Sequence, residues 1–91
     1  MKALQVTNVA TRIVVGNPCR NFIHLFNNSD ATIYVSYDGD PLVTPAIGMP
    51  ILPGDHLSLN NDGHRVLYGL DVYAIHNSGV GVNKEIRIQG D

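Results

Sequence analysis

Hydrophobic and polar residues alternate along most of this chain, in short runs separated by glycine, proline and asparagine. Leu4 and Val6 alternate with polar neighbours, and Ile86 and Ile88 do the same near the C-terminus. Successive side chains of a strand point to opposite faces, so a period of two predicts half-buried β-strands. No window carries apolar residues at helical spacing over about ten positions without an intervening Gly or Pro. The pattern therefore predicts an all-β chain.

The apolar runs and the turn residues between them predict seven or eight short strands. We expect strands within residues 4–7, 11–15, 20–26, 32–37, 55–60, 65–76 and 84–89, with 42–44 a short strand at best. Both faces of 20–26 carry apolar side chains, which predicts a strand that is central or covered on both sides. The proline-rich segment 46–53 is expected at a sheet edge or in a long crossing loop. These features indicate one small antiparallel β-sandwich over residues 1–91, either Ig-like or jelly-roll in strand order.

Composition narrows the classes of partner. The chain has six Lys and Arg against eight Asp and Glu, with a net charge of -2. It lacks the basic stripe that phosphate-backbone binding needs, so no nucleic-acid partner is expected, although Arg12, Arg20, Arg65 and Arg87 could form a local patch. Low charge on a small domain also suggests a surface covered by copies of itself or by a larger partner.

Cys19 is the single cysteine, so neither a disulfide framework nor a cysteine-based zinc site is predicted. The N-terminus lacks the apolar core and cleavage site of a signal peptide. No apolar run approaches membrane-spanning length, so no membrane association is expected. A reducing cytosol is the expected place of assembly.

The candidates for metal binding and catalysis are weak. The spacings of His24, His56, His64 and His76 match neither a zinc finger nor a helical HExxH pair. The acidic turns at 38–40 and 60–63 lack the bidentate Glu of a calcium loop. No serine lies in a G-x-S-x-G elbow, and Cys19 has no evident histidine partner. We expect no metal, no cofactor and no enzymatic activity; a cupin-like metal enzyme using the histidines is a weaker alternative.

Tyrosines are the more promising contact residues, because they combine rigid contact area with a hydroxyl and are enriched in interfaces and sugar-binding surfaces. Tyr34 and Tyr73 lie on strand faces opposite valines, which predicts that they point outward. A sandwich core with tyrosine hydroxyls at its rim is the alternative. The candidate interaction residues are Tyr34, Tyr37, Tyr73, Arg12 and Arg65.

The longest organised segment, 22–54, contains FIHLFNNSDATIYVSYDG and GMPILPG, followed later by LYGLDVYAI and EIRIQG. An apolar strand, Asn-x-Ser, IYVxYxG and G-x-x-I-x-P-G follow in this order. Over residues 20–90 the combination resembles the small all-β proteins of tailed-phage virions. That resemblance implies a capsid decoration (cement) protein, or a head, tail or fibre accessory protein, with no catalytic residues.

As a cement protein the chain would bind the major capsid protein on the capsid exterior and stabilise contacts between its subunits, after assembly in the host cytoplasm. A homo-oligomer is expected, with a trimer the leading prediction. Residues 1–8 could form an exchanging N-terminal strand or arm that adds to a neighbour by β-augmentation. A small carbohydrate-binding module using Tyr34, Tyr73 and the acidic turns is the alternative from a different class.

Overall fold

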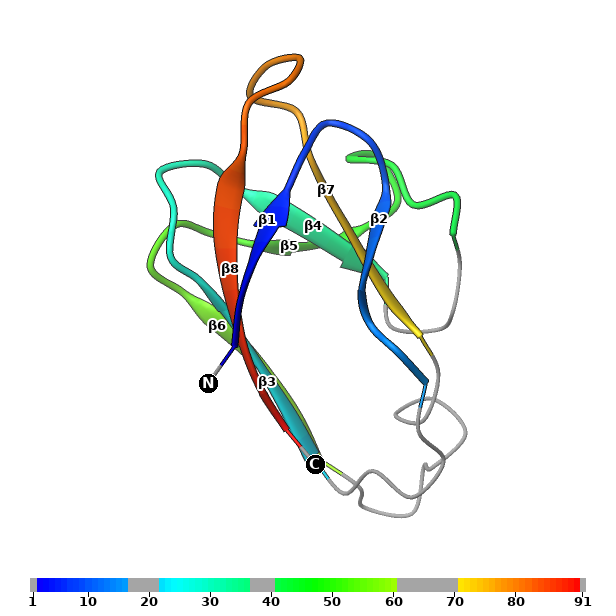
Figure 1. Cartoon of the computed structure of the whole chain (residues 1–91), viewed down its shortest axis with the longest axis vertical. Coiled ribbons are helices and arrows are strands. Elements are labelled where there is room, and N and C mark those ends of the chain that lie inside the picture. Colours follow the sequence, from blue (N-terminus) through cyan, green and yellow to red (C-terminus); the bar gives the residue numbers. More distant parts are fainter. Residues whose placement is uncertain (1, 17–21, 37–40, 61–70, 91) are drawn as a thin grey trace.

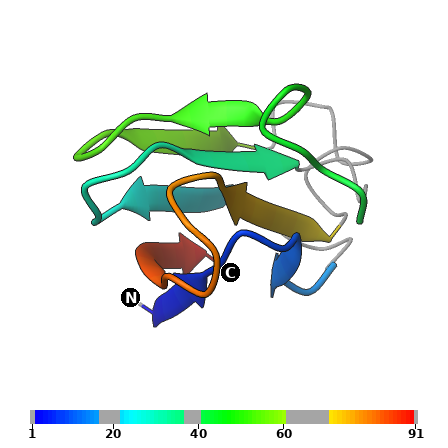
Figure 2. The same cartoon turned by 90° about the horizontal axis from the view of Figure 1, so that it is seen from above.

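In the part of the chain that the structure describes, eight antiparallel strands form two four-stranded sheets that pack face to face (Figures 1 and 2). The computed structural model describes residues 2–16, 22–36, 41–60 and 71–90. Sheet I has the order β1-β8-β3-β6 and sheet II the order β2-β7-β4-β5. The strands are β1 (Lys2–Val6), β2 (Thr11–Val14), β3 (Phe22–Asn27), β4 (Ile33–Ser36), β5 (Met49–Ile51), β6 (His56–Asn60), β7 (Val72–His76) and β8 (Lys84–Gly90). None of the described ranges holds a helix of the length and apolarity that crossing a bilayer requires.

The strand order is that of a jelly roll. The first strand pairs with the eighth, the second with the seventh, the third with the sixth and the fourth with the fifth. Such an order arises when one long hairpin rolls up so that its paired strands alternate between two sheets. The fold is thus the predicted small antiparallel β-sandwich, and its strand order is the jelly roll instead of the Ig-like alternative.

The core lies between the sheets and follows the predicted alternation. Sheet I contributes Ile23 and Leu25 from the central strand β3, and sheet II contributes Ile33 and Val35 from β4; all four are almost fully buried. The neighbouring central strands add Val72, Ala74, Ile86 and Ile88. Each buried aliphatic side chain contributes roughly 1.5–3 kcal/mol of transfer free energy, so these two inner faces supply most of the driving force for folding.

A buried asparagine at the end of β3 connects the two sheets. The Asn27 side-chain amide donates hydrogen bonds to the carbonyls of Ala31 and Ile51, each at 2.7 Å. Its carbonyl oxygen accepts from the backbone N–H of Ser29 at 3.1 Å and from the Ser29 hydroxyl at 2.6 Å. Ile51 belongs to β5 of sheet II, so one residue of sheet I fixes both its own turn and a strand of the opposite sheet.

The Pro-Gly corner after β5 closes onto the same asparagine. The N–H of Gly54 donates to the carbonyl of Asn27 at 2.9 Å, and the N–H of Asn27 donates to the carbonyl of Asp55 at 3.0 Å. Gly54 has φ of 77°, a left-handed conformation that glycine adopts at little cost. The Asn-x-Ser and P-G parts of the sequence pattern are therefore two halves of one hydrogen-bonded connection.

One expectation about local structure is wrong, that of at best a short strand at 42–44. These residues form no strand, because the Thr44 carbonyl accepts hydrogen bonds from the N–H groups of Ile47 and Gly48 and because prolines without an N–H donor flank the segment. The turn at 27–30 leads from one sheet to the other, since β3 and β4 belong to different sheets. By contrast, 46–53 supplies an edge strand, β5, as expected. The strand expected at 65–70 lies outside the described residues.

The N-terminal strand lies at the edge of sheet I in this chain. Lys2–Val6 pairs with β8 in antiparallel register, with Leu4 opposite Ile86 and Val6 opposite Lys84. Val6 is fully buried, whereas Lys2, Ala3 and Gln5 are exposed. β1 thus belongs to the sandwich of its own chain here, and its exchange with a neighbour stays a prediction.

Candidate functional site

Three of the five candidate interaction residues lie on the outer face of sheet II. Arg12 of β2 pairs with Tyr73 of β7, which in turn pairs with Ser36 of β4. Tyr34 pairs with Ile75 in the next outward row. Both tyrosines point outward as predicted, and both are half-buried. Tyr37 and Arg65 lie outside the described residues.

Arg12 already has an intramolecular partner. Its Nη1 lies 3.7 Å from Oδ2 of Asp71, and the two side chains are 52% and 32% exposed. The other carboxylate oxygen of Asp71 accepts the backbone N–H of Gly16. An exposed ion pair of this kind stabilises by about 0–1 kcal/mol. Arg12 is therefore held beside Tyr73 by a weak contact that a partner's carboxylate could replace.

Tyr34 is covered by the connection between β4 and β5. A Cβ placed on Gly48 would lie 2.8 Å from the Cβ of Tyr34 and 3.0 Å from Val43 Cγ2, which shows how closely the connection packs. Val43 is itself buried, although its neighbours are exposed. A sugar ring stacks on an accessible aromatic face, and Tyr34 is half-buried, which weakens it as a carbohydrate contact.

The described histidines occupy separate places. His24 and His56 lie on the outer face of sheet I, whereas His76 is buried at the end of β7. His24 Nδ1 is 2.6 Å from the Ser58 hydroxyl, and its ring centroid is 5.3 Å from that of Phe22. His64 lies outside the described residues. In the ranges that the structure covers, no three His, Cys, Asp or Glu side chains come together as metal ligands would.

The buried His76 is used by the backbone of its own loop. Its Nδ1 accepts the N–H of Ser78 at 3.1 Å, which places the ring proton on Nε2, and Nε2 donates to the carbonyl of Val82 at 2.6 Å. The backbone N–H of His76 donates to the carbonyl of Thr7 at 3.1 Å. This histidine therefore shapes the β7–β8 connection and joins it to the β1–β2 connection.

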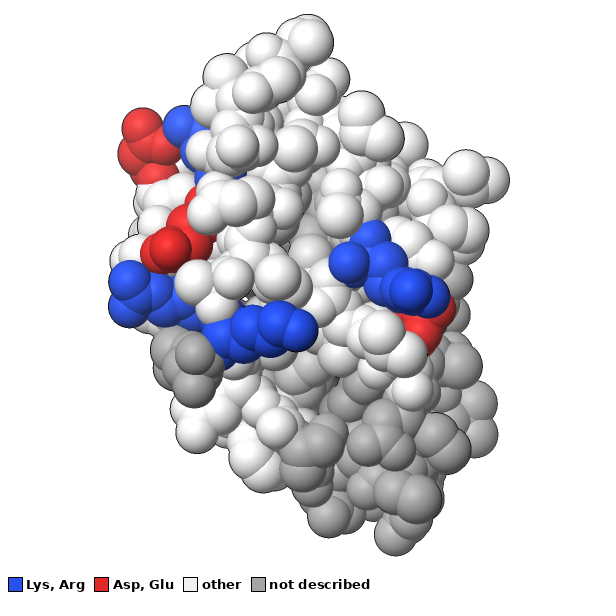
Figure 3. All heavy atoms as spheres, in the orientation of Figure 1, with Lys and Arg blue, Asp and Glu red and all other residues white. Residues whose placement is uncertain are grey.

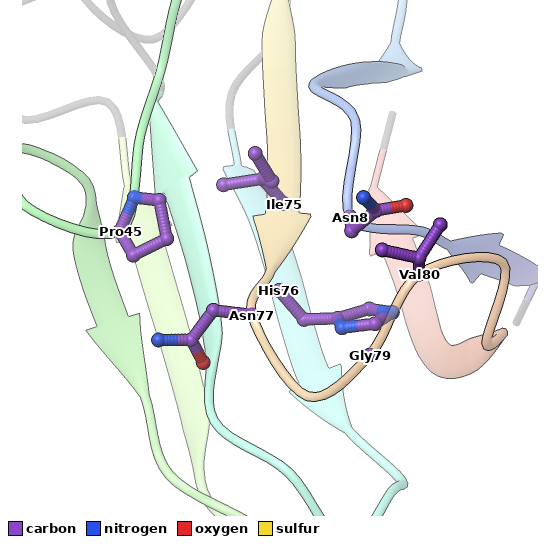
Figure 4. A pocket seen from close by; sticks show the side chains of 7 residues that line it. All are labelled: Asn8, Pro45, Ile75, His76, Asn77, Gly79 and Val80. Atoms are coloured by element: carbon purple, nitrogen blue, oxygen red, sulfur yellow. The ribbon is translucent and has the colours of Figure 1, made fainter.

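A shallow pocket opens where three connections meet (Figure 4). It has a volume of about 260 Å³. Pro45 lies on one side, Asn8 and Val80 lie on the other, and Ile75 lies between them. Asn77, His76 and Gly79 complete the lining. The lining is mostly apolar, with two amide side chains and the imidazole of His76 as its polar side chains.

Sequence reasoning missed the exposed aliphatic residues around this pocket. Residues 7–10, 41–48 and 77–83, which we call the uncharged end, contain Val9, Leu42, Ile47 and Val80, exposed by 65%, 77%, 67% and 89%. The backbone N–H of Gly81 donates to Asn8 Oδ1 at 3.4 Å, which joins two of the connections. The sequence feature that could have indicated this surface is the presence of aliphatic residues in segments that contain Gly, Pro or Asn but no charged residue.

The described charged side chains lie outside the uncharged end. On the face that Figure 3 shows, they form two groups below the top of the view, where the β7–β8 connection lies. Lys84 Nζ is 2.6 Å from Asp30 Oδ1, and this hydrogen bond together with the positive charge lowers the pKa of Asp30. The pKa of Glu85 is lowered by a hydrogen bond from Asn28 and more weakly by Arg87. Both carboxyls stay ionised at neutral pH as surface partners of basic or amide groups.

Comparison of the chain with protein-family models, curated proteins and solved structures finds no match. The assignment of a function therefore depends on the strand order, the chemistry of the surface and the sequence resemblance.

Proposed function

We propose that this chain is a non-enzymatic structural protein of a tailed-phage virion. Its role would be that of a capsid cement or decoration protein, which binds the outer head lattice and stabilises contacts between major capsid subunits. The observation that carries the proposal is the eight-strand jelly-roll order. Viral capsid domains share this architecture, as do lectins and cupins, so the support is an analogy of fold.

The surface chemistry favours protein binding over catalysis within this group of jelly rolls. Among the described residues, eight large hydrophobic side chains are exposed, Val80 and Leu42 among them. Aliphatic side chains held in water contribute nothing to the folding of the monomer and become favourable when a partner covers them. On a capsid lattice, many such modest contacts add up through avidity.

The hydrogen bonds around Asn27 give the sequence resemblance to phage virion proteins a physical basis. Asn27, Ser29 and Gly54, which belong to the shared pattern, are joined by hydrogen bonds. They stiffen the loops at one edge of the sandwich. A rigid small domain loses little conformational entropy when it binds a lattice. The carbohydrate-binding alternative has less support, because both described outer-face tyrosines are half-buried.

The proposal is tested by co-sedimentation. Purified chain is mixed with shells assembled from the major capsid protein encoded in the same genome, and an unrelated β-sandwich of similar size serves as the control. We expect a saturable, fixed number of copies per shell and a higher temperature of shell disassembly. If the chain stays in the supernatant at all concentrations and leaves shell stability unchanged, it is not a cement protein.

A further inference from the structure

The uncharged end differs from the remainder of the chain in composition. The chain has six basic and eight acidic residues, and none of them lies in residues 7–10, 41–48 or 77–83. The β1–β2 and β7–β8 connections are free of charge over their whole length, whereas the β3–β4, β4–β5 and β5–β6 connections carry Asp30, Asp38 with Asp40, and Asp55; Asp38 and Asp40 precede residue 41 and lie outside the described residues. Charge depletion is the compositional mark of the buried core of an interface.

The same end presents projecting apolar side chains beside an apolar recess. Val80, 89% exposed, is the most exposed of the large hydrophobic residues described, and Val9 and Ile47 are each about two-thirds exposed, at 65% and 67%. Pro45 and Ile75 line the pocket next to them (Figure 4). Figures 1 and 2 both place the β1–β2 and β7–β8 connections side by side.

We propose that the uncharged end is the surface through which copies of this chain associate with one another. The inference rests on the proposed function, in that it names the surface that forms the expected homo-oligomer. Interfaces between identical subunits are more apolar than transient interfaces, whose composition resembles ordinary protein surface. An aliphatic patch without charged residues is therefore more typical of an interface with a second copy of the chain than of an interface with a partner that binds transiently.

Electrostatics and symmetry support the same occupant. Two copies that meet through a patch of a single charge sign bring like charges together, whereas contacts between the charge-free β1–β2 and β7–β8 connections of two copies carry no such repulsion. Closed oligomers also need complementary features within one protomer. The projecting Val80 and the recess beside Pro45 provide such a pair on the same end. The aliphatic contacts would be buried and the Asn8 and Asn77 amides would lie where hydrogen bonds across the interface can form.

The test compares oligomer order in matched variants. Wild type, Val80→Asp, Ile47→Asp and Leu52→Asp are measured by native mass spectrometry and by sedimentation velocity over a range of concentrations. Leu52 is the control, because it is 57% exposed but lies between β5 and β6, at the opposite edge of the sandwich from β1 and β2. Far-UV circular dichroism and thermal unfolding establish that each variant is folded.

We expect a wild-type oligomer that Val80→Asp and Ile47→Asp each convert to monomer, with the dissociation constant raised about 100-fold or more, as for a hot-spot residue. Leu52→Asp should associate like wild type. A wild type that is monomeric at every concentration overturns the inference. So does an oligomer that Leu52→Asp dissociates while Val80→Asp and Ile47→Asp leave it intact.

The shell-binding assay separates this inference from the proposed function. A monomeric wild type that still co-sediments with shells overturns self-association and leaves the cement role standing. If Val80→Asp then abolishes that binding, the uncharged end contacts the capsid instead of a second copy. An oligomer that requires Val80 but does not bind shells supports the inference and overturns the cement role.

Discussion

Replacement of Asn27 by alanine tests whether one buried amide holds the two sheets together. The side chain is fully buried and makes four hydrogen bonds, two donated to the carbonyls of Ala31 and Ile51 and two accepted from Ser29. Alanine removes all four. The carbonyl of Ala31 still accepts a hydrogen bond from the Ser29 hydroxyl, at 3.0 Å. The carbonyl of Ile51 loses the hydrogen bond that joins it to sheet I through Asn27.

The expected loss is about 2–4 kcal/mol in the free energy of unfolding. A buried polar group left without its partner costs roughly 1–3 kcal/mol, and two carbonyls lose a donor in this variant. A domain of this size has a total stability of about 5–14 kcal/mol. Because each 1 kcal/mol shifts the melting temperature by about 4–8 °C in a domain of 60–100 residues, the melting temperature should fall by at least about 8 °C.

Guanidinium chloride unfolding followed by circular dichroism measures this loss, with Asn28→Ala as the matched control. Asn28 is the adjacent asparagine, exposed, and its side chain bonds only the exposed carboxylate of Glu85 among the contacts described. We expect that control to lose less than about 1 kcal/mol. Equal losses in the two variants would refute the view that Asn27 joins the sheets.

Asn27→Asp sharpens the test because it keeps the shape of the side chain. It replaces the amide donor with an oxygen that faces two carbonyl oxygens. Burial and this repulsion raise the pKa of the introduced carboxyl, so the folded state binds its proton more tightly than the unfolded state does. The variant should therefore gain stability as pH falls from 7 toward 4, and a variant that loses stability over that range would contradict the geometry.

Three further changes have separate expected outcomes. Gly48→Ala should lower the free energy of unfolding by about 1–3 kcal/mol, because the new Cβ would lie 2.8 Å from the Cβ of Tyr34. A thermal shift assay measures this loss, and an unchanged melting temperature would mean that the connection moves to make room for the methyl group. Leu25→Ala should cost about 2–5 kcal/mol in denaturant unfolding, because the side chain is fully buried, and a loss below 1 kcal/mol would mean that the core collapses around it. Lys84 lowers the pKa of Asp30 in the folded state. The pair therefore stabilises the fold at pH values above the ordinary carboxyl pKa of about 4, and this stabilisation is lost as the pH falls through the lower pKa of the folded state. Lys84→Met should flatten the dependence of stability on pH between about 5 and 2, measured by unfolding titrations, and an unchanged slope would show that the pair does not act.

Local periodicity was sufficient to predict the strands and the inward side chains. Ile23, Leu25, Ile33 and Val35 alternate with less buried neighbours, and alternation is a property of adjacent residues. Strand pairing could not be predicted in the same way, because β1 pairs with β8 across most of the chain. The burial of a turn residue could not be predicted locally either. Asn27 lies in a run of polar residues typical of a surface turn, and its contact with Ile51, 24 residues away, helps to bury it.

The sequence also predicted the outward direction of Tyr34 and Tyr73 but not that the β4–β5 connection packs against Tyr34. That packing depends on how the connection folds back, which Gly48 permits through the absence of a side chain. The uncharged end could not be predicted because its members are dispersed over three connections that only the jelly roll brings together. Valine and isoleucine in such segments suggest strands when each segment is considered alone.

The position of β8 inside sheet I has a consequence for synthesis on the ribosome. β8 separates β1 from β3 in that sheet, so sheet I cannot form its native order before residues 84–90 emerge. The hairpin of β4 and β5 is the pair closest in sequence and can form early, whereas each outer pair must wait for a longer loop to close. A nascent chain thus exposes two unpaired strand edges until residues 84–90 have emerged, which favours slow folding and a dependence on chaperones at high expression.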